Sequence, residues 1–183
     1  MDNFNGMNQY NMNQYNEPAA KVKNPIISRC FNASAILGTI SAILIFVSLY
    51  LPAIDLSHFD EKIEQKYTLI KLCERINDFI SEIWAGIPVG IIIGAVLMIV
   101  LSYIKIPLLK LIPSFIVMAM VIIMLVDMGN IIEFVKYMLE TTHVETSTVV
   151  DTKEVFQSFQ AGIYVLAAGL ITGFISCFMP TPE

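Results

Sequence analysis

The sequence predicts an all-α integral membrane protein, a bundle of four transmembrane helices with a small extracytoplasmic cap. The first observation is that four stretches carry no charged residue: 30–54, 83–104, 111–126 and 155–182. A run of roughly 18 or more apolar residues can cross a bilayer. The second is that the chain is 56% hydrophobic and only 15% charged, whereas soluble domains have about 25% charged residues. The third is length. Four spans and two loops use nearly all of the 183 residues, so we expect one membrane domain at 30–183 and no separate soluble enzyme domain.

Residues 1–29 are expected to form a disordered, polar cytoplasmic tail. Asn, Gln, Met and Tyr dominate residues 1–20, which contain a near-repeat of MNQYN, and such a composition cannot bury a core. A tyrosine-bearing docking tail is the alternative to a plain solvated one. Because the first apolar run starts only after this segment and no small-residue cleavage pattern follows it, we expect a retained helix rather than a secretory signal.

The spans are predicted at 33–51, 83–103, 107–127 and 159–178. Tyr50 and Pro52 close the first span, as an interfacial aromatic residue and a helix stop. Trp84 opens the second span and suits an anchor at headgroup level. The third span has the shortest charge-free stretch. It reaches a full crossing only when it is counted from Pro107 with the Lys110 side chain snorkelling to the interface.

Basic residues predict that both termini are cytoplasmic, because short cytoplasmic segments are enriched in Lys and Arg. Three basic residues precede the first span, and Lys105 and Lys110 lie in the connector between the second and third spans, which holds no acid. The external loops are predicted at 55–82 and 128–158, and together with Asp127 they hold thirteen of the sixteen acids. The expected location is therefore a cytoplasmic (inner or plasma) membrane, with an acidic external side.

The external loops are expected to be partly structured. In 69–83, apolar residues recur at spacings of four and three, the stripe of an amphipathic helix that could run straight into the second span. The preceding QKYTLI (65–70) fits either a short strand or the start of that helix. Residues 130–140 continue the helical period of the third span, and TSTVV (146–150) favours an extended segment. Pairing of QKYTLI with TSTVV would give the cap a small sheet.

Glycines at spacing four are the strongest local signal within the spans. The set comprises Gly86, Gly90 and Gly94 in the second span, Gly169 and Gly173 in the fourth, and Gly38 in the first. Small residues let helices approach closely in lipid and gain dispersion contacts. We interpret these glycines as packing positions within the bundle, with self-association as the alternative. A pore would need polar lining groups, which appear scarce in the spans.

Asp127 is the candidate functional acid, because it is the one acid near a span interior. An ionisable group inside a membrane is a functional hypothesis by default. The two interpretations are a plain interfacial position and an ion or proton relay.

Signals for catalysis and for metal binding are weak. His58 and His143 lie on different external loops, each near acids, but no HExxH motif or cysteine pair accompanies them. Cys30, Cys73 and Cys177 are too scattered for a disulfide framework or a zinc site. No acyl-transfer motif and no basic cluster for nucleic acid is present. The sequence therefore predicts a non-enzymatic protein with no cofactor, no metal and no nucleic-acid partner.

The layout resembles that of the claudin and tetraspanin families, although the claudin W-x-x-W with two cysteines and the tetraspanin CCG are missing. The chain is more similar to uncharacterised bacterial four-span proteins with an Asn/Gln/Tyr-rich head. Its shared motifs are a YLP closure of the first span (Tyr50, Leu51 and Pro52) and a G-x-Y-x-L pattern in the fourth (Gly162, Tyr164 and Leu166). The resemblance implies four spans and no known activity.

The expected role is that of a structural, accessory or partner-binding membrane component that acts through its acidic external loops. Its partners would be the lipid bilayer and either a second copy of the chain or another membrane protein. The alternative is a small oligomeric channel or transport subunit, and a third hypothesis is an immunity or envelope-stress protein.

Overall fold

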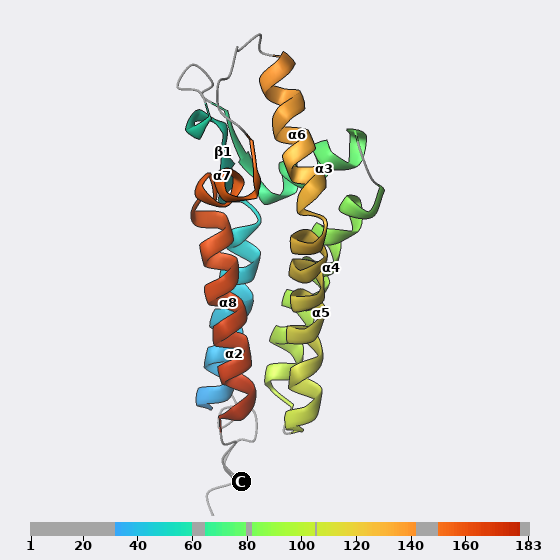
Figure 1. Cartoon of the computed structure of the whole chain (residues 1–183). Coiled ribbons are helices and arrows are strands. Elements are labelled where there is room, and N and C mark those ends of the chain that lie inside the picture. Colours follow the sequence, from blue (N-terminus) through green and yellow to red (C-terminus); the bar gives the residue numbers. More distant parts are fainter. Residues whose placement is uncertain (1–31, 60–64, 80–81, 105, 142–149, 180–183) are drawn as a thin grey trace, which may run out of the picture.

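Four apolar helices lie side by side in the computed structural model, which describes residues 32–59, 65–79, 82–104, 106–141 and 150–179 (Figure 1). They are α2 (Ala33–Ser48), α4 (Gly86–Ser102), α5 (Pro107–Val126) and α8 (Ala161–Phe178). Helix α2 packs against α8 and α4, and α5 packs against α4 and α8. Each of the four helices therefore contacts two others. The predicted tail, 1–29, lies outside the described residues.

Three segments are long and apolar enough to cross a membrane: Glu82–Ser102, Leu108–Val126 and Ala161–Phe178. They coincide with the second, third and fourth predicted spans. The helix in the first predicted span, α2, has 16 residues. At about 1.5 Å per residue it is roughly 24 Å long, against about 30 Å for the hydrocarbon core of a bilayer. The described chain thus holds three helices of spanning length beside a shorter apolar one.

Helix α2 buries mostly small residues and exposes large ones. The buried residues of α2 are Ser34, Ala35, Gly38, Ser41, Ala42, Ile45 and Ser48, whereas Ile36, Ile43 and Phe46 are all more than 40% exposed. Soluble proteins rarely expose such a continuous apolar surface. Small residues between helices, with large aliphatic side chains facing outward, are typical of helices that pack in lipid.

The remaining described elements form one folded unit at one end of the bundle, which we call the cap (Figure 1). It contains β1 (Pro52–Asp55), η1 (Leu56–His58), β2 (Lys66–Thr68), α3 (Leu69–Phe79), η2 (Glu82–Ala85), α6 (Met128–Thr141) and α7 (Thr152–Gln157). Strands β1 and β2 pair antiparallel. On the other side of β1, the Gln160 N–H donates to Ala53 O at 2.9 Å and the Asp55 N–H donates to Ser158 O at 3.1 Å. The cap core includes the fully buried Trp84 and is continuous with the core of the bundle.

The segment QKYTLI (65–70) contains both structures that the sequence predicted as alternatives, a short strand and the start of the amphipathic helix. The strand β2 ends at Thr68, and α3 begins at Leu69. The described partner of β2 is β1, a segment that the sequence interpretation treated only as a helix stop. Of TSTVV, only Val150 is described, without regular structure, so the predicted pairing lies outside the described residues.

The amphipathic stripe is confirmed in α3 but not beyond it. Leu69, Cys73 and Ile76 are fully buried. The helix ends at Phe79, and the separate 3-10 turn η2 precedes α4, so α3 does not run straight into the second span. Ile83, at the end of the predicted stripe, is 63% exposed. Trp84, the next residue of η2, is buried in place of Ile83.

Candidate functional site

Asp127 forms the corner between α5 and α6, where it is the single residue that separates the two helices. Its Oδ2 accepts hydrogen bonds from Trp84 Nε1 at 2.5 Å and from Asn130 Nδ2 at 2.6 Å. Both donors are neutral. The contacts join the start of α6 to η2, so Asp127 lies at the junction of α5, α6 and η2. Asp127 is itself half-buried.

Trp84 corrects one expectation from the sequence. We predicted an anchor at headgroup level, but the indole is fully buried. It lies in η2, and its donation to Asp127 joins the start of α4 to the α5–α6 corner. A buried indole N–H needs an acceptor, and the Asp127 carboxylate supplies it.

Most of the glycines predicted as packing positions face other helices of the same chain. On α4, a Cβ at Gly90 would lie 2.7 Å from Met120 Sδ, and a Cβ at Gly94 would collide with Val117, both on α5. On α8, Gly169 faces Ile45 and Gly173 faces Ser41.

Gly38 and Gly86 are the other two predicted positions, and only the first of them faces another helix. Gly162 is a close contact that the spacing did not predict. Gly38 on α2 faces Ser102 on α4, whereas a Cβ at Gly86 would meet no described atom within 4 Å. Gly162, which the sequence interpretation did not treat as a packing position, faces backbone carbonyl oxygens of the segment that follows α2. A spacing-four rule could not find Gly162, since its contact is with a turn rather than with a helix face.

Lys110 is only 5% exposed, although the sequence predicts that its side chain snorkels to the interface. Its Nζ donates to Ser34 Oγ on α2 at 2.9 Å, and Ser34 Oγ donates to the backbone oxygen of Ser176 on α8 at 2.7 Å. Cys177 Sγ lies 3.3 Å from the backbone oxygen of Lys110, to which it donates. The lysine therefore ties three helices together at the end opposite the cap. One turn along α5, Ser114 is fully buried, and its hydroxyl has no partner among the described residues.

Polar groups are more numerous inside the bundle than the sequence interpretation allowed. Buried serines lie on all four apolar helices: Ser34, Ser41, Ser48, Ser102, Ser114 and Ser176. Ser41 Oγ, for example, donates to Gly169 O across the α2–α8 contact at 2.6 Å. The signal was present in the sequence, because Ser34 and Ser41 occupy the same helical stripe as Gly38.

The histidine hypothesis is only partly covered by the described residues. His58 Nε2 lies 3.2 Å from Glu154 Oε2 at the cap surface, while His143 lies outside the described ranges. Over the part of the chain that the structure describes, no group of three His, Cys, Asp or Glu residues could hold a metal ion. Cys73 and Cys177 are buried free thiols, and burial raises the pKa of Cys73 to about 12.

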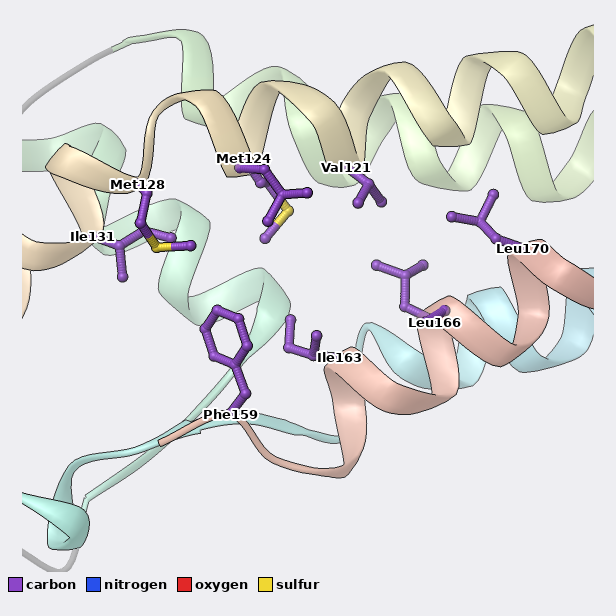
Figure 2. Close-up of a pocket in the computed structure, with 10 residues that line it drawn as sticks. Val121, Met124, Met128, Ile131, Phe159, Ile163, Leu166 and Leu170 are labelled. Atoms are coloured by element: carbon purple, nitrogen blue, oxygen red, sulfur yellow. The ribbon is translucent and has the colours of Figure 1, made fainter. Parts of the chain in front are cut away.

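An apolar groove of about 100 Å³ lies between α5 and α8 near the cap. Figure 2 shows side chains from α5 and α6 pointing across it toward Phe159 and α8. The described residues that line the groove are all apolar: Val121, Met124, Leu125, Met128, Ile131, Phe159, Ile163, Leu166, Ala167 and Leu170. Of these, Leu125 and Ala167 are exposed, so they mark the mouth of the groove.

Two aromatic rings are in contact on the cap surface. The ring centroids of Phe79 on α3 and Tyr137 on α6 are 4.5 Å apart, and the two side chains are 50% and 41% exposed. Exposed carboxylates accompany them: Asp78 precedes Phe79, while Glu133 and Glu140 lie one turn before and one turn after Tyr137. Two exposed bases lie nearby as well, Arg75 one turn before Phe79 and Lys136 next to Tyr137. We call the two rings and the three carboxylates the cap patch.

No protein-family profile matches this chain, and neither a curated protein nor a solved structure is significantly similar to it. The resemblance to uncharacterised bacterial four-span proteins therefore stays a prediction. The groove, the buried lysine and the cap patch are the features from which a function can be argued.

Proposed function

We propose that this chain is a non-enzymatic, four-span protein of a bacterial cytoplasmic membrane whose extracytoplasmic cap binds a protein partner. Three helices of spanning length support the membrane placement, as do the large apolar side chains exposed on all four apolar helices. Helix α2 supplies the remaining span, the first in the chain, since the charge-free sequence continues beyond both of its ends. The basic residues of the tail and of the connector at Lys105 then make both termini cytoplasmic.

The cap patch is the observation that carries the binding role. Exposed aromatic residues are enriched in protein interfaces, and a few of them contribute most of the binding energy. The three carboxylates outnumber the neighbouring bases Arg75 and Lys136 and therefore favour a partner with a basic rim, because complementary charge promotes the encounter and excludes wrong partners. Helix α6, which carries Tyr137, is joined at its start to η2 by the hydrogen bond from Trp84 to Asp127.

A photocrosslinking residue at Tyr137, in the full chain and in native membranes, tests this proposal. We expect one discrete protein adduct whose yield falls several-fold at high ionic strength and in the charge-reversed variant Glu133→Lys with Glu140→Lys. Phe156 is the matched control, because it is also an exposed aromatic residue of the cap, at 45%, and should give no such adduct. Equal adducts from both positions, adducts that tolerate charge reversal, or adducts with lipid alone would each contradict the proposal.

The alternative, an oligomeric channel or transport subunit, has one observation in its favour. Lys110 and several serines are buried inside the bundle, and ionisable groups inside membranes commonly mark ion or substrate pathways. Ion flux through nanodisc-embedded protein that is lost in Lys110→Met would favour this alternative. A chain that stays monomeric and carries no flux would remove it.

A further inference from the structure

The groove between α5 and α8 opens on a surface that faces lipid in the placement proposed above. We propose that it binds one hydrocarbon chain of a phospholipid from the membrane leaflet next to the cap. This inference rests on the proposed membrane placement and not on the protein partner of the cap.

The groove exists because α5 and α8 diverge toward the cap. At the opposite end the two helices are in contact, through Cys177 Sγ and Lys110 O at 3.3 Å. Phe115 and Phe174 meet edge to face on the same pair of helices, with centroids 5.9 Å apart. Nearer the cap, the described side chains leave about 100 Å³ between the helices. The space between α5 and α8 is therefore wedge-shaped and widens toward the cap.

An empty groove or a hydrated one would be unfavourable. A water needs only about 10–15 Å³, but it also needs two to four polar partners, and the described lining offers apolar side chains. Lining atoms that face an unfilled space lose dispersion contacts. A hydrocarbon occupant restores those contacts and requires no hydrogen bond.

The shape and chemistry of the groove favour an acyl chain over a peptide. A peptide in extended form would bring backbone N–H and C=O groups that need partners in a low-dielectric site. A helix is about 10–12 Å across with its side chains, so one turn of it fills several times the groove volume of about 100 Å³. A single acyl chain is linear and apolar, and it is the molecule that surrounds the spans.

The position of the groove distinguishes a bound chain from bulk lipid. Its mouth lies between Leu125 and Ala167, which are exposed, whereas its far end reaches the buried Met128 and Ile131 on α6. Those two residues follow the Asp127 corner, so they belong to the cap. In Figure 2, Phe159 closes the same end. Because the headgroup of a lipid in this leaflet lies level with the cap, the part of the bound chain next to the headgroup is held against the cap, and flexible methionine side chains adapt to its contour.

The test uses the full chain in nanodiscs of phosphatidylglycerol that contain a phospholipid with a photoreactive diazirine in its acyl chain. Peptide mapping should find several-fold more label on groove residues such as Met124, Met128 and Leu166 than on the exposed surfaces of α2 and α4. Ala167→Trp fills the mouth and should reduce the groove label several-fold without changing the label elsewhere. Ala168→Trp is the matched control, because Ala168 is the next residue of α8, is exposed and does not line the groove.

Leu125→Trp blocks the mouth from the α5 side, so the test remains decisive if one variant fails to fold. Label that is spread evenly over all lipid-facing residues, or groove label that persists in both blocked variants, overturns the inference and leaves the membrane placement intact. Capture of a protein helix by the groove also overturns it. Absence of label from the exposed surfaces of α2 and α4 overturns the membrane placement itself.

Discussion

At Gly162, α8 lies against the backbone at the end of α2 and just after it, and substitution by alanine tests that contact. A Cβ at Gly162 would lie 2.8 Å from Pro52 O, 2.9 Å from Leu51 O and 3.1 Å from Ser48 O. All three atoms belong to the backbone, so no side-chain rotation can make room. Gly162→Ala must therefore push α8 away from the segment that leads into β1.

The expected loss of stability follows from two opposing effects. Overpacking costs about 1–3 kcal/mol, and backbone neighbours place this case at the upper end. Alanine for glycine recovers about 0.4–1 kcal/mol by restricting the unfolded chain. The net loss is about 2 kcal/mol, which lowers Tm by about 4–8 °C on the scale of domains of 150–250 residues.

Thermal unfolding in detergent micelles, followed by circular dichroism, measures the effect. Gly86→Ala is the matched control, since a Cβ there would meet no described atom within 4 Å, and it should change stability by less than about 0.5 kcal/mol. A Gly162→Ala protein as stable as Gly86→Ala would refute the reasoning. So would a Gly86→Ala protein that loses as much stability as Gly162→Ala.

Three further predictions concern the cap. Trp84→Phe removes the donor to Asp127 and should lower the free energy of unfolding by about 1.5–3 kcal/mol, the range for a hydrogen bond to a charged group; a double-mutant cycle with Asp127→Asn should show the coupling. Burial alone would raise the pKa of the Asp55 carboxyl, but hydrogen bonds from Ser57 and Lys66 hold it below its ordinary value of 3.8. Because the folded pKa is the lower one, this stabilisation is complete above the unfolded pKa and disappears as pH falls through the folded pKa. Fluorescence of Trp84, the only tryptophan, should therefore report a weaker cap below about pH 4, and Asp55→Asn should remove that component. Burial raises the pKa of Cys73 to about 12, so a variant with Cys73 as its sole cysteine should resist alkylation at mildly alkaline pH until detergent unfolds it.

The periodicity of the sequence predicted burial well where one helix face is wet. In α3, charged residues separate the apolar ones, and Leu69, Cys73 and Ile76 are buried as expected. Helices that are apolar all round offer no such contrast. The inward face of α4 and the burial of Lys110 could therefore not be assigned by periodicity.

Contacts between distant segments account for the other differences. The strand β1 has only four residues and begins with proline, so its local signal is weak. It becomes a strand through pairing with β2 and through backbone bonds to the segment before α8. The burial of Trp84 likewise depends on a distant segment, because its hydrogen-bond acceptor Asp127 is 43 residues away in the chain.

The sequence by itself determined the apolar helices and the charged segments between them, because a stretch without charge that is long enough to cross a bilayer is a local property of the chain. The tertiary structure decided which residues point inward: serines, glycines and one lysine in the bundle, and the tryptophan in the cap. It also decided that α5 and α8 close at Lys110 and diverge around the groove. Those outcomes depend on which helix surfaces fit one another, a property of pairs of segments that no single stretch of sequence contains.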